Sequence, residues 1–177
     1  VEFTKKAINI DPENYYNYNS MARVSENAAN LKIPNAYENA RNAYIEATKY
    51  NPYNPSLYLS VAKLDAANGK YDLAKEYIQR SLLIKNDYVD AVYTLSQIQV
   101  QNNEISNAIE STKVAIQLDK SNPTLYLQLG LLFYNLKDYK NASLSFVEAL
   151  KLNNQYANAK YFLGLSLYYT GDIKDSI

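Results

Sequence analysis

The side chains best suited to catalysis in this sequence are carboxylates, because histidine and cysteine are both absent. Their absence excludes a Ser-His-Asp or Cys-His nucleophile and a metal site built on histidine or cysteine. Paired carboxylates could still act as general acid and base. The candidates Asp65, Glu110, Glu148 and Asp172 fall at positions that predict solvated helix faces or turns. We therefore expect this segment to have no enzymatic activity, no cofactor and no bound metal.

Two further patterns with chemical meaning are equally weak. The four glycines are spread along the chain, so they form no glycine-rich phosphate loop. Asn141-Ala142-Ser143 matches the acceptor pattern for N-glycosylation. It falls inside a predicted helix with Ala142 on the packed face, and we expect the match to be accidental.

The charge balance narrows the classes of partner. Eighteen basic and eighteen acidic side chains give a net charge of zero, with no basic block along the chain. A protein that follows nucleic acid needs an excess of Lys and Arg against the phosphates, and an anionic membrane surface makes the same demand. No apolar run approaches the roughly 20 residues that span a bilayer as a helix. We expect no nucleic-acid partner and no direct membrane contact from this segment.

The first residue is Val1 rather than Met. We expect the sequence to belong to a longer protein, so that any targeting or membrane segment would lie outside it. A cytoplasmic location is the default expectation.

A period of 34 residues organises the chain. Apolar or small residues recur at this spacing in six columns, and internal repetition of this kind indicates a stack of similar structural units. The columns are Tyr37, Tyr71, Ile105, Tyr139 and Ile173; Ala40, Ala74, Ala108 and Ala142; Tyr44, Ile78, Thr112 and Phe146; Ala47, Ser81, Ala115 and Ala149; Val61, Leu95, Leu129 and Leu163; and Ala62, Ser96, Gly130 and Gly164. The small columns predict close approach of two helices, with a thinner packing point at Thr112.

Within one unit the apolar residues follow helical spacing. Tyr126, Leu129, Gly130 and Phe133 lie at i, i+3, i+4 and i+7, which places them on one face of a helix. A second stripe begins at Tyr139 after a short polar turn. In neighbouring units Gly69 and Gly171 occupy this turn and can supply the left-handed residue that ends a helix. Pro12, Pro52, Pro55 and Pro123 fall at or just after the joints between units, where proline can begin a helix.

These residues resemble the tetratricopeptide signature, in which an aromatic, a Leu-Gly pair, an aromatic, an alanine, an aromatic and an alanine recur over 34 residues. In one unit the matching residues are Tyr126, Leu129, Gly130, Phe133, Ala142, Phe146 and Ala149. The resemblance covers essentially the whole chain. It implies an all-α fold, a right-handed α-α superhelix (solenoid) of antiparallel helix hairpins. Val92 and Lys160 depart from the first aromatic of the pattern.

The repeats predict a single solenoid over residues 1–177. Residues 1–14 form the trailing second helix of a truncated repeat, followed by repeats 15–54, 55–88, 89–122 and 123–156 and a truncated final repeat 157–177. The first complete repeat is six residues longer than the period, and the surplus is expected within Glu26 to Asn35, with Pro34 opening the second helix. It is either a tolerated surface-loop insertion or a loop that contacts a partner or a second copy.

The resemblance implies that the first helix of each hairpin lines a concave groove. Early lining positions are polar and include two cations, whereas later positions are apolar and aromatic. The predicted lining residues are Tyr16, Asn19, Arg23, Leu59, Lys63, Tyr93, Gln97, Leu127, Leu131, Tyr134, Tyr161, Leu165 and Tyr168. The apolar half has a second interpretation, in which Leu127, Leu131, Leu165 and Tyr168 pack against further repeats or a terminal helix.

The expected function is a protein–protein interaction scaffold that binds a peptide or protein segment in this groove. One alternative is a structural element that self-associates through its truncated ends. Another is an accessory interaction domain of a larger enzyme or membrane protein. The carboxylate grip that some tetratricopeptide domains apply to chaperone C-termini is not predicted, because Asp90 stands at one of the corresponding positions and would repel a carboxylate. The residues do not identify the partner.

Overall fold

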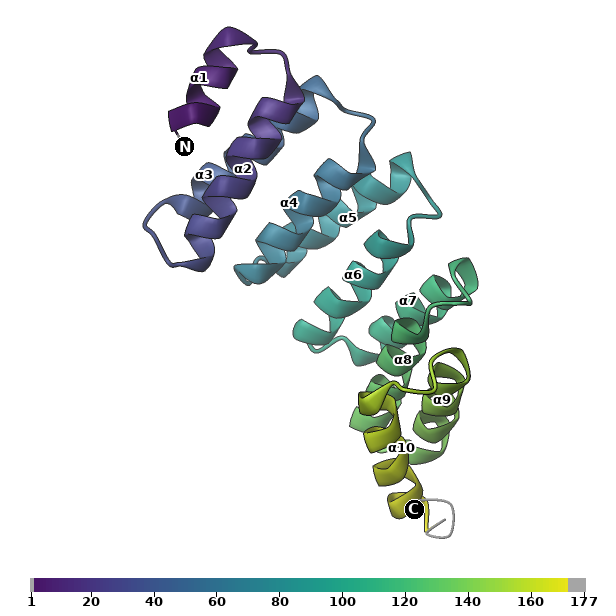
Figure 1. The fold of residues 1–177 in the computed structure, drawn as a ribbon. Coiled ribbons are helices and arrows are strands. Elements are labelled where there is room, and N and C mark those ends of the chain that lie inside the picture. Colours follow the sequence, from purple (N-terminus) through teal and green to yellow (C-terminus); the bar gives the residue numbers. More distant parts are fainter. Residues whose placement is uncertain (1, 172–177) are drawn as a thin grey trace. The chain divides into compact units, whose positions relative to one another are not determined.

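The computed structural model describes residues 2–171, which form ten α-helices and no strand (Figure 1). The chain divides into two compact units, Val1–Ala91 (unit 1) and Val92–Ile177 (unit 2), with the boundary inside the sixth helix. The predicted all-α helical-repeat fold is confirmed. The second helix of the last repeat, with Asp172 and Ile173, lies outside the described residues. The helices are α1 (Glu2–Ile10), α2 (Tyr15–Asn30), α3 (Ala36–Tyr50), α4 (Pro55–Ala67), α5 (Tyr71–Ile84), α6 (Val89–Gln101), α7 (Ile105–Leu118), α8 (Pro123–Asn135), α9 (Tyr139–Leu152) and α10 (Ala157–Thr170).

In three hairpins the first helix (α2, α4 or α8) begins with an asparagine cap. The side chains of Asn14, Asn54 and Asn122 each accept the backbone N–H two residues further on, at 3.1 Å. Pro55 and Pro123 follow two of these caps as the first helical residue, as the sequence predicts. Pro12 and Pro52 instead lie in the preceding turns. Each cap contributes about 1 kcal/mol by satisfying a backbone donor that has no partner inside the helix.

The turns between paired helices share one backbone feature. A left-handed residue recurs every 34 positions, at Asn35, Gly69, Asn103, Lys137 and Gly171, with φ between 60° and 85°. After this residue the chain turns back toward the end of the preceding helix. In the turn between α8 and α9, for example, the N–H of Asp138 donates to the carbonyl of Phe133 at 2.9 Å. The predictions for Gly69 and Gly171 are confirmed. The left-handed conformation of Asn103 and Lys137 was not predicted from the sequence, since residues with a Cβ adopt it less readily than glycine.

The surplus of the first complete hairpin is divided among three places. Helix α2 has 16 residues where α4, α6 and α8 have 13, and α3 has 15 where α5, α7 and α9 have 14. The remainder lies in the connection 31–35. Four of the six surplus residues therefore extend helices rather than a loop. The prediction that Pro34 opens the second helix is wrong: Pro34 lies in the turn, and α3 begins at Ala36 after the left-handed Asn35.

Within a hairpin, a small residue on the first helix is matched to a larger one on the second. Gly130 of α8 lies directly against the ring of Phe146 of α9, and both are buried. Ala62 and Ile78 occupy the same two positions in α4 and α5 and are 0% exposed. The small residue lets the helices approach, and the larger one fills the space between them.

The third hairpin fills the same positions with a polar pair. Ser96 and Thr112 are 0% exposed, and their hydroxyl oxygens lie 2.7 Å apart. Both hydroxyls also reach the carbonyl of Ala108, at 3.1 Å from Ser96 and 2.8 Å from Thr112. Thr112 is thus a hydrogen-bonded core residue, and the thinner packing point at this position stays a prediction.

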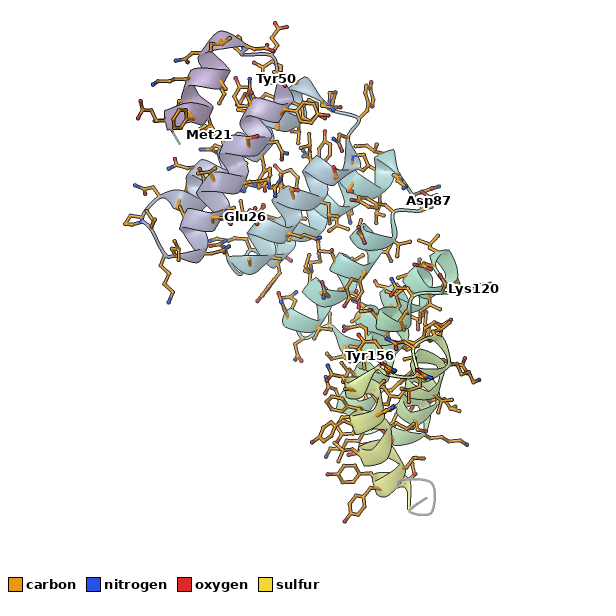
Figure 2. All side chains as sticks on the ribbon, viewed as in Figure 1. Met21, Glu26, Tyr50, Asp87, Lys120 and Tyr156 are labelled. Carbon is orange, nitrogen blue, oxygen red and sulfur yellow. The ribbon has the colours of Figure 1, made fainter. Side chains whose placement is uncertain are left out.

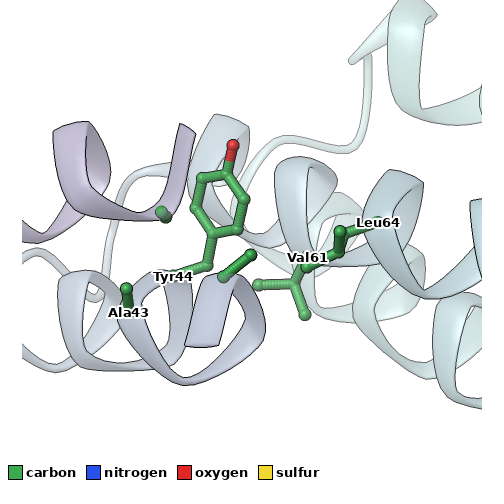
Figure 3. Close-up of a cluster of buried hydrophobic side chains, with 6 residues drawn as sticks. Ala43, Tyr44, Val61 and Leu64 are labelled. Atoms are coloured by element: carbon green, nitrogen blue, oxygen red, sulfur yellow. The ribbon is translucent and has the colours of Figure 1, made fainter. Parts of the chain in front are cut away.

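The hydrophobic core of each unit lies between neighbouring helices. In unit 1, Ala43 and Tyr44 of α3 pack with Val61 and Leu64 of α4 (Figure 3). In unit 2, Phe146 of α9 is at the centre of a cluster with residues of α8 and α10. Because each cluster joins one hairpin to the next, the exposed faces of the first helices are held in fixed relation within a unit.

Candidate interaction surfaces

The predicted lining residues of unit 1 divide between surface and core. Arg23, Lys63 and Tyr16 are exposed, Tyr16 to 63%, and Asn19 is half-buried. Leu59 is only 4% exposed, so its assignment to the surface is wrong. Helix α4 buries residues on several sides, among them Leu57, Leu59, Val61 and Leu64, because it packs against more than one neighbour.

Unit 2 keeps more of its predicted lining on the surface. Tyr161 and Tyr168 of α10 are 64% and 62% exposed, and Gln97 is exposed. Tyr93, Leu131, Tyr134 and Leu165 are half-buried. Leu127 is 7% exposed and belongs to the core cluster around Phe146, so it too was wrongly assigned to the surface.

Tyrosines gather where α8, α9 and α10 meet. The ring of Tyr139 stacks on that of Tyr169 with centroids 4.6 Å apart, and Tyr134 meets Tyr139 edge-on at 5.3 Å. Tyr134 also meets Phe162 edge-on at 5.4 Å. Such contacts stabilise beyond simple area burial, so this end of α8 is held firmly against α10.

Burial raises the pKa of the Tyr134 hydroxyl, and the nearby hydroxyls of Tyr169, Tyr139 and Tyr161 raise it further. Burial likewise raises the pKa of Tyr93, with a smaller effect from Tyr156, which is labelled in Figure 2 at the joint before α10. These phenols are therefore uncharged at neutral pH and act as hydrogen-bonding groups on an apolar body.

We name five residues on the neighbouring helices α8 and α10 of unit 2 the tyrosine face: Leu131, Tyr134, Tyr161, Leu165 and Tyr168. On α10, Tyr161, Leu165 and Tyr168 lie at i, i+4 and i+7, so they share one side of the helix. Leu131 and Tyr134 come from the neighbouring α8, which contacts α10 directly.

Unit 1 contains a buried polar cluster around Asp65 that was not predicted from the sequence. Asp65 is 0% exposed, so its assignment to a solvated face or turn is wrong. Its carboxylate accepts hydrogen bonds from the Tyr37 hydroxyl at 2.8 Å and from Arg41 Nε at 2.9 Å. Arg41 also lies over the ring of Tyr77, 5.6 Å from its centroid. One signal was available: the column of Asp65 continues as Gln99, Phe133 and Leu167, which marks a buried position.

This cluster has the geometry of a structural ion pair. Burial raises the pKa of Tyr37 to about 12, and its hydrogen bond to Asp65 adds to the effect. Two donors, Tyr37 of α3 and Arg41 of α3, converge on the carboxylate of Asp65 of α4, and Arg41 also contacts Tyr77 of α5, so the cluster joins these three helices.

The extended first hairpin borders a cavity of about 280 Å³ in unit 1. Its wall combines Lys5 of α1, Met21 and Ala28 of α2 (Met21 is labelled in Figure 2), and Ile33 and Pro34 of the 31–35 connection. The surplus residues therefore shape a surface depression in addition to lengthening α2. The hypothesis that they contact a partner stays a prediction.

Among residues 2–171, no group of three or more acidic side chains comes together in a way that could hold a metal ion. None of the helices in that range combines the length and the apolar character that crossing a membrane requires.

The fold places the chain among helical-repeat proteins, which offer an extended surface rather than an enclosed active site. Two family models match: one described as TPR repeat over residues 96–137 and one described as tetratricopeptide repeat over residues 123–156. Residues 96–156 thus match tetratricopeptide repeat models, as the periodic columns predict. Tetratricopeptide repeats are a general protein-interaction module, so the coarse role of an interaction scaffold follows.

Among curated relatives, the chain is similar to the TPR repeat-containing protein YpiA of Bacillus subtilis, with 26% identity over 113 residues. The match covers 64% of this chain and 27% of the relative, so the chain spans about a quarter of that protein's length.

Solved structures share the fold. The crystal structure of the MamA protein superimposes with a TM-score of 0.76 at 18% identity, covering 92% of this chain and 85% of that one. YrrB, described as a TPR protein with an unusual peptide-binding site, gives 0.70 at 19% identity, covering 98% and 86%. At these identities the likeness is one of fold.

Proposed function

We propose that the protein is an interaction scaffold that binds a segment of another protein on the exposed face of its first helices, with the tyrosine face of unit 2 as the principal contact. The single observation that carries the proposal is the exposure of Tyr161 and Tyr168 of α10, at 64% and 62%. Large aromatic side chains on a surface are typical anchors of protein interfaces, since they supply area at little conformational cost.

The chemistry of the site supports binding rather than reaction. Phenols and leucines offer apolar contact and hydrogen-bond donors but no nucleophile activated by a base. The solved structure of YrrB, a TPR protein with an unusual peptide-binding site, shares this fold and supports a peptide ligand here. The contribution of unit 1 through Arg23 and Lys63 stays part of the proposal, since both side chains are exposed.

Selection of short random peptides against the purified chain tests the proposal. The selected peptides are expected to lose about tenfold or more in affinity for a Tyr161→Ser, Tyr168→Ser double variant, because aromatic anchors carry much of the binding energy. Tyr53→Ser is the matched control, since Tyr53 is an 83% exposed tyrosine of unit 1 outside this face. The proposal fails if the double variant binds as tightly as the parent, or if the control loses as much.

A further inference from the structure

The turn between α4 and α5 contains the only Asn-Gly pair of the sequence, Asn68 and Gly69. Asparagine is chemically labile, because the backbone nitrogen of the residue that follows it can attack the side-chain amide. Glycine in that following position has no Cβ to hinder the attack. Both residues are exposed, so water reaches them. The pair is therefore a candidate site of covalent modification.

The folded turn holds both reacting groups in hydrogen bonds. The Nδ2 amide of Asn68 donates to the backbone carbonyl of Leu64 at 2.8 Å, which directs the side chain back along α4. The N–H of Gly69 donates to the carbonyl of Ala66 at 3.0 Å. Both acceptors are carbonyls at the end of α4, where a helix leaves such groups without a partner of its own. The reaction requires both bonds to break, because the Gly69 nitrogen must lose its proton and the Asn68 side chain must turn toward it.

The turn between α6 and α7 offers a matched site in the same chain. Asn102 stands at the repeat position of Asn68 and is followed by Asn103 instead of a glycine. Asn103 has the left-handed conformation of Gly69, with φ of 60° against 73°. In both turns this residue donates its N–H to the carbonyl three residues before it, at 3.0 Å. The two turns therefore share a backbone geometry, and the Cβ of Asn103 distinguishes their chemistry.

We propose that Asn68 is a site of spontaneous deamidation, and that the reaction is governed by opening of the α4–α5 turn. In the opened turn the Gly69 nitrogen forms a bond to Cγ of Asn68, and the bond from Cγ to Nδ2 breaks. The side-chain nitrogen leaves as ammonia, together with the proton that the Gly69 nitrogen gives up, and a cyclic imide remains. Water then opens the imide at either of its two carbonyls, which gives an aspartate or a β-linked isoaspartate at this position.

Either product weakens the end of α4. A carboxylate cannot donate the hydrogen bond that Asn68 Nδ2 makes to the carbonyl of Leu64. Its negative charge also lies at the C-terminal end of the helix, where the helix dipole is negative. The β-linked product adds a further carbon to the backbone of the turn. The modified chain is therefore expected to open this turn more readily than the unmodified chain.

Peptide mapping by tandem mass spectrometry tests the proposal on the whole chain, incubated in mildly alkaline buffer with and without unfolding concentrations of urea. In the unfolded chain, Asn68 is expected to convert faster than every other asparagine, Asn102 included. In the folded chain its conversion is expected to be slower by about tenfold or more, because two hydrogen bonds must open first. A short Asn-Gly model peptide, measured with and without urea, corrects for the effect of urea on the chemistry itself.

Gly69→Asn is the matched variant, since Asn103 holds the left-handed conformation in the equivalent turn. In the unfolded variant Asn68 is expected to convert as slowly as Asn102, and circular dichroism without urea establishes that the variant folds. The site is overturned if another asparagine of the unfolded chain converts before Asn68, or if Gly69→Asn leaves the rate at Asn68 unchanged. Equal rates at Asn68 in the folded and unfolded chain would overturn the role of the turn.

Discussion

Replacing Gly130 by alanine is expected to destabilise the protein, although alanine is the better helix former. A Cβ at this position would lie 2.5 Å, 2.6 Å and 2.9 Å from three ring carbons of Phe146. Carbon atoms rest about 3.5–4.0 Å apart, so the ring must move by about 1 Å. Phe146 is 0% exposed and enclosed by neighbouring helices, which leaves it little room.

The magnitude follows from two opposing effects. Overpacking a close-packed core costs about 1–3 kcal/mol. Removing a glycine from the interior of a helix returns about 0.5–1 kcal/mol. We expect the free energy of unfolding to fall by about 0.5–2 kcal/mol, measured by urea denaturation followed by circular dichroism at 222 nm, the standard helix signal, with an unchanged denaturant slope.

A second substitution provides the control. The double variant Gly130→Ala, Phe146→Ile reproduces the Ala62 and Ile78 pair found at the same positions of α4 and α5. It is expected to be more stable than the sum of the two single effects predicts, by about 1 kcal/mol or more, because the smaller side chain relieves the overlap. The reasoning is refuted if Gly130→Ala is as stable as the parent, or if the two effects simply add.

Three further predictions concern other parts of the fold. Asp65→Ala should lower the free energy of unfolding by about 3–5 kcal/mol in urea denaturation, since it leaves Arg41 partly buried without its partner. A loss below about 1 kcal/mol, the value of an exposed ion pair, would contradict this. Lys137→Gly should raise stability by about 0.5–1 kcal/mol, because Lys137 has φ of 60° and the left-handed conformation strains residues with a Cβ; an unchanged or lower melting temperature would count against it. The free energy of unfolding should also fall as pH rises from 10 toward 12, because folding raises the pKa of Tyr37 from 10.0 to about 12, so that the Tyr37 hydroxyl loses its proton at lower pH in the unfolded chain than in the folded one. Tyr37→Phe should reduce this loss of stability. An identical pH profile for the variant would refute the raised pKa of Tyr37.

Much of the fold could be predicted because the repeat is visible in single residues. Columns such as Ala74, Ala108 and Ala142 recur in register, and each of these alanines is 0% exposed. Pro55 and Pro123 marked two helix beginnings correctly. The division of the first hairpin's surplus was not visible, since helix propensity is a weak guide to where a helix ends and packing decides how far α2 extends through Ala28, Ala29 and Asn30.

The candidate site was predicted only in part, for a geometric reason. Counting along a helix assumes one buried side and one exposed side, which holds for Tyr161 and Tyr168 on α10. It fails for Leu59 and Leu127, because α4 and α8 contact neighbours on more than one side and have a wider buried surface. Asp65 was missed because a lone acidic residue suggests solvent, and only its distant partners Tyr37 and Arg41 explain its burial.

The matched residues inside each hairpin limit how such a protein can be recombined. Because the glycine of α8 suits the phenylalanine of α9 and the serine of α6 suits the threonine of α7, a helix moved alone into another hairpin would meet the wrong counterpart. An exchange of whole hairpins keeps every counterpart together. Duplication, deletion or engineering of this array should therefore succeed in steps of 34 residues that cut outside the paired helices, and fail when the cut falls between them.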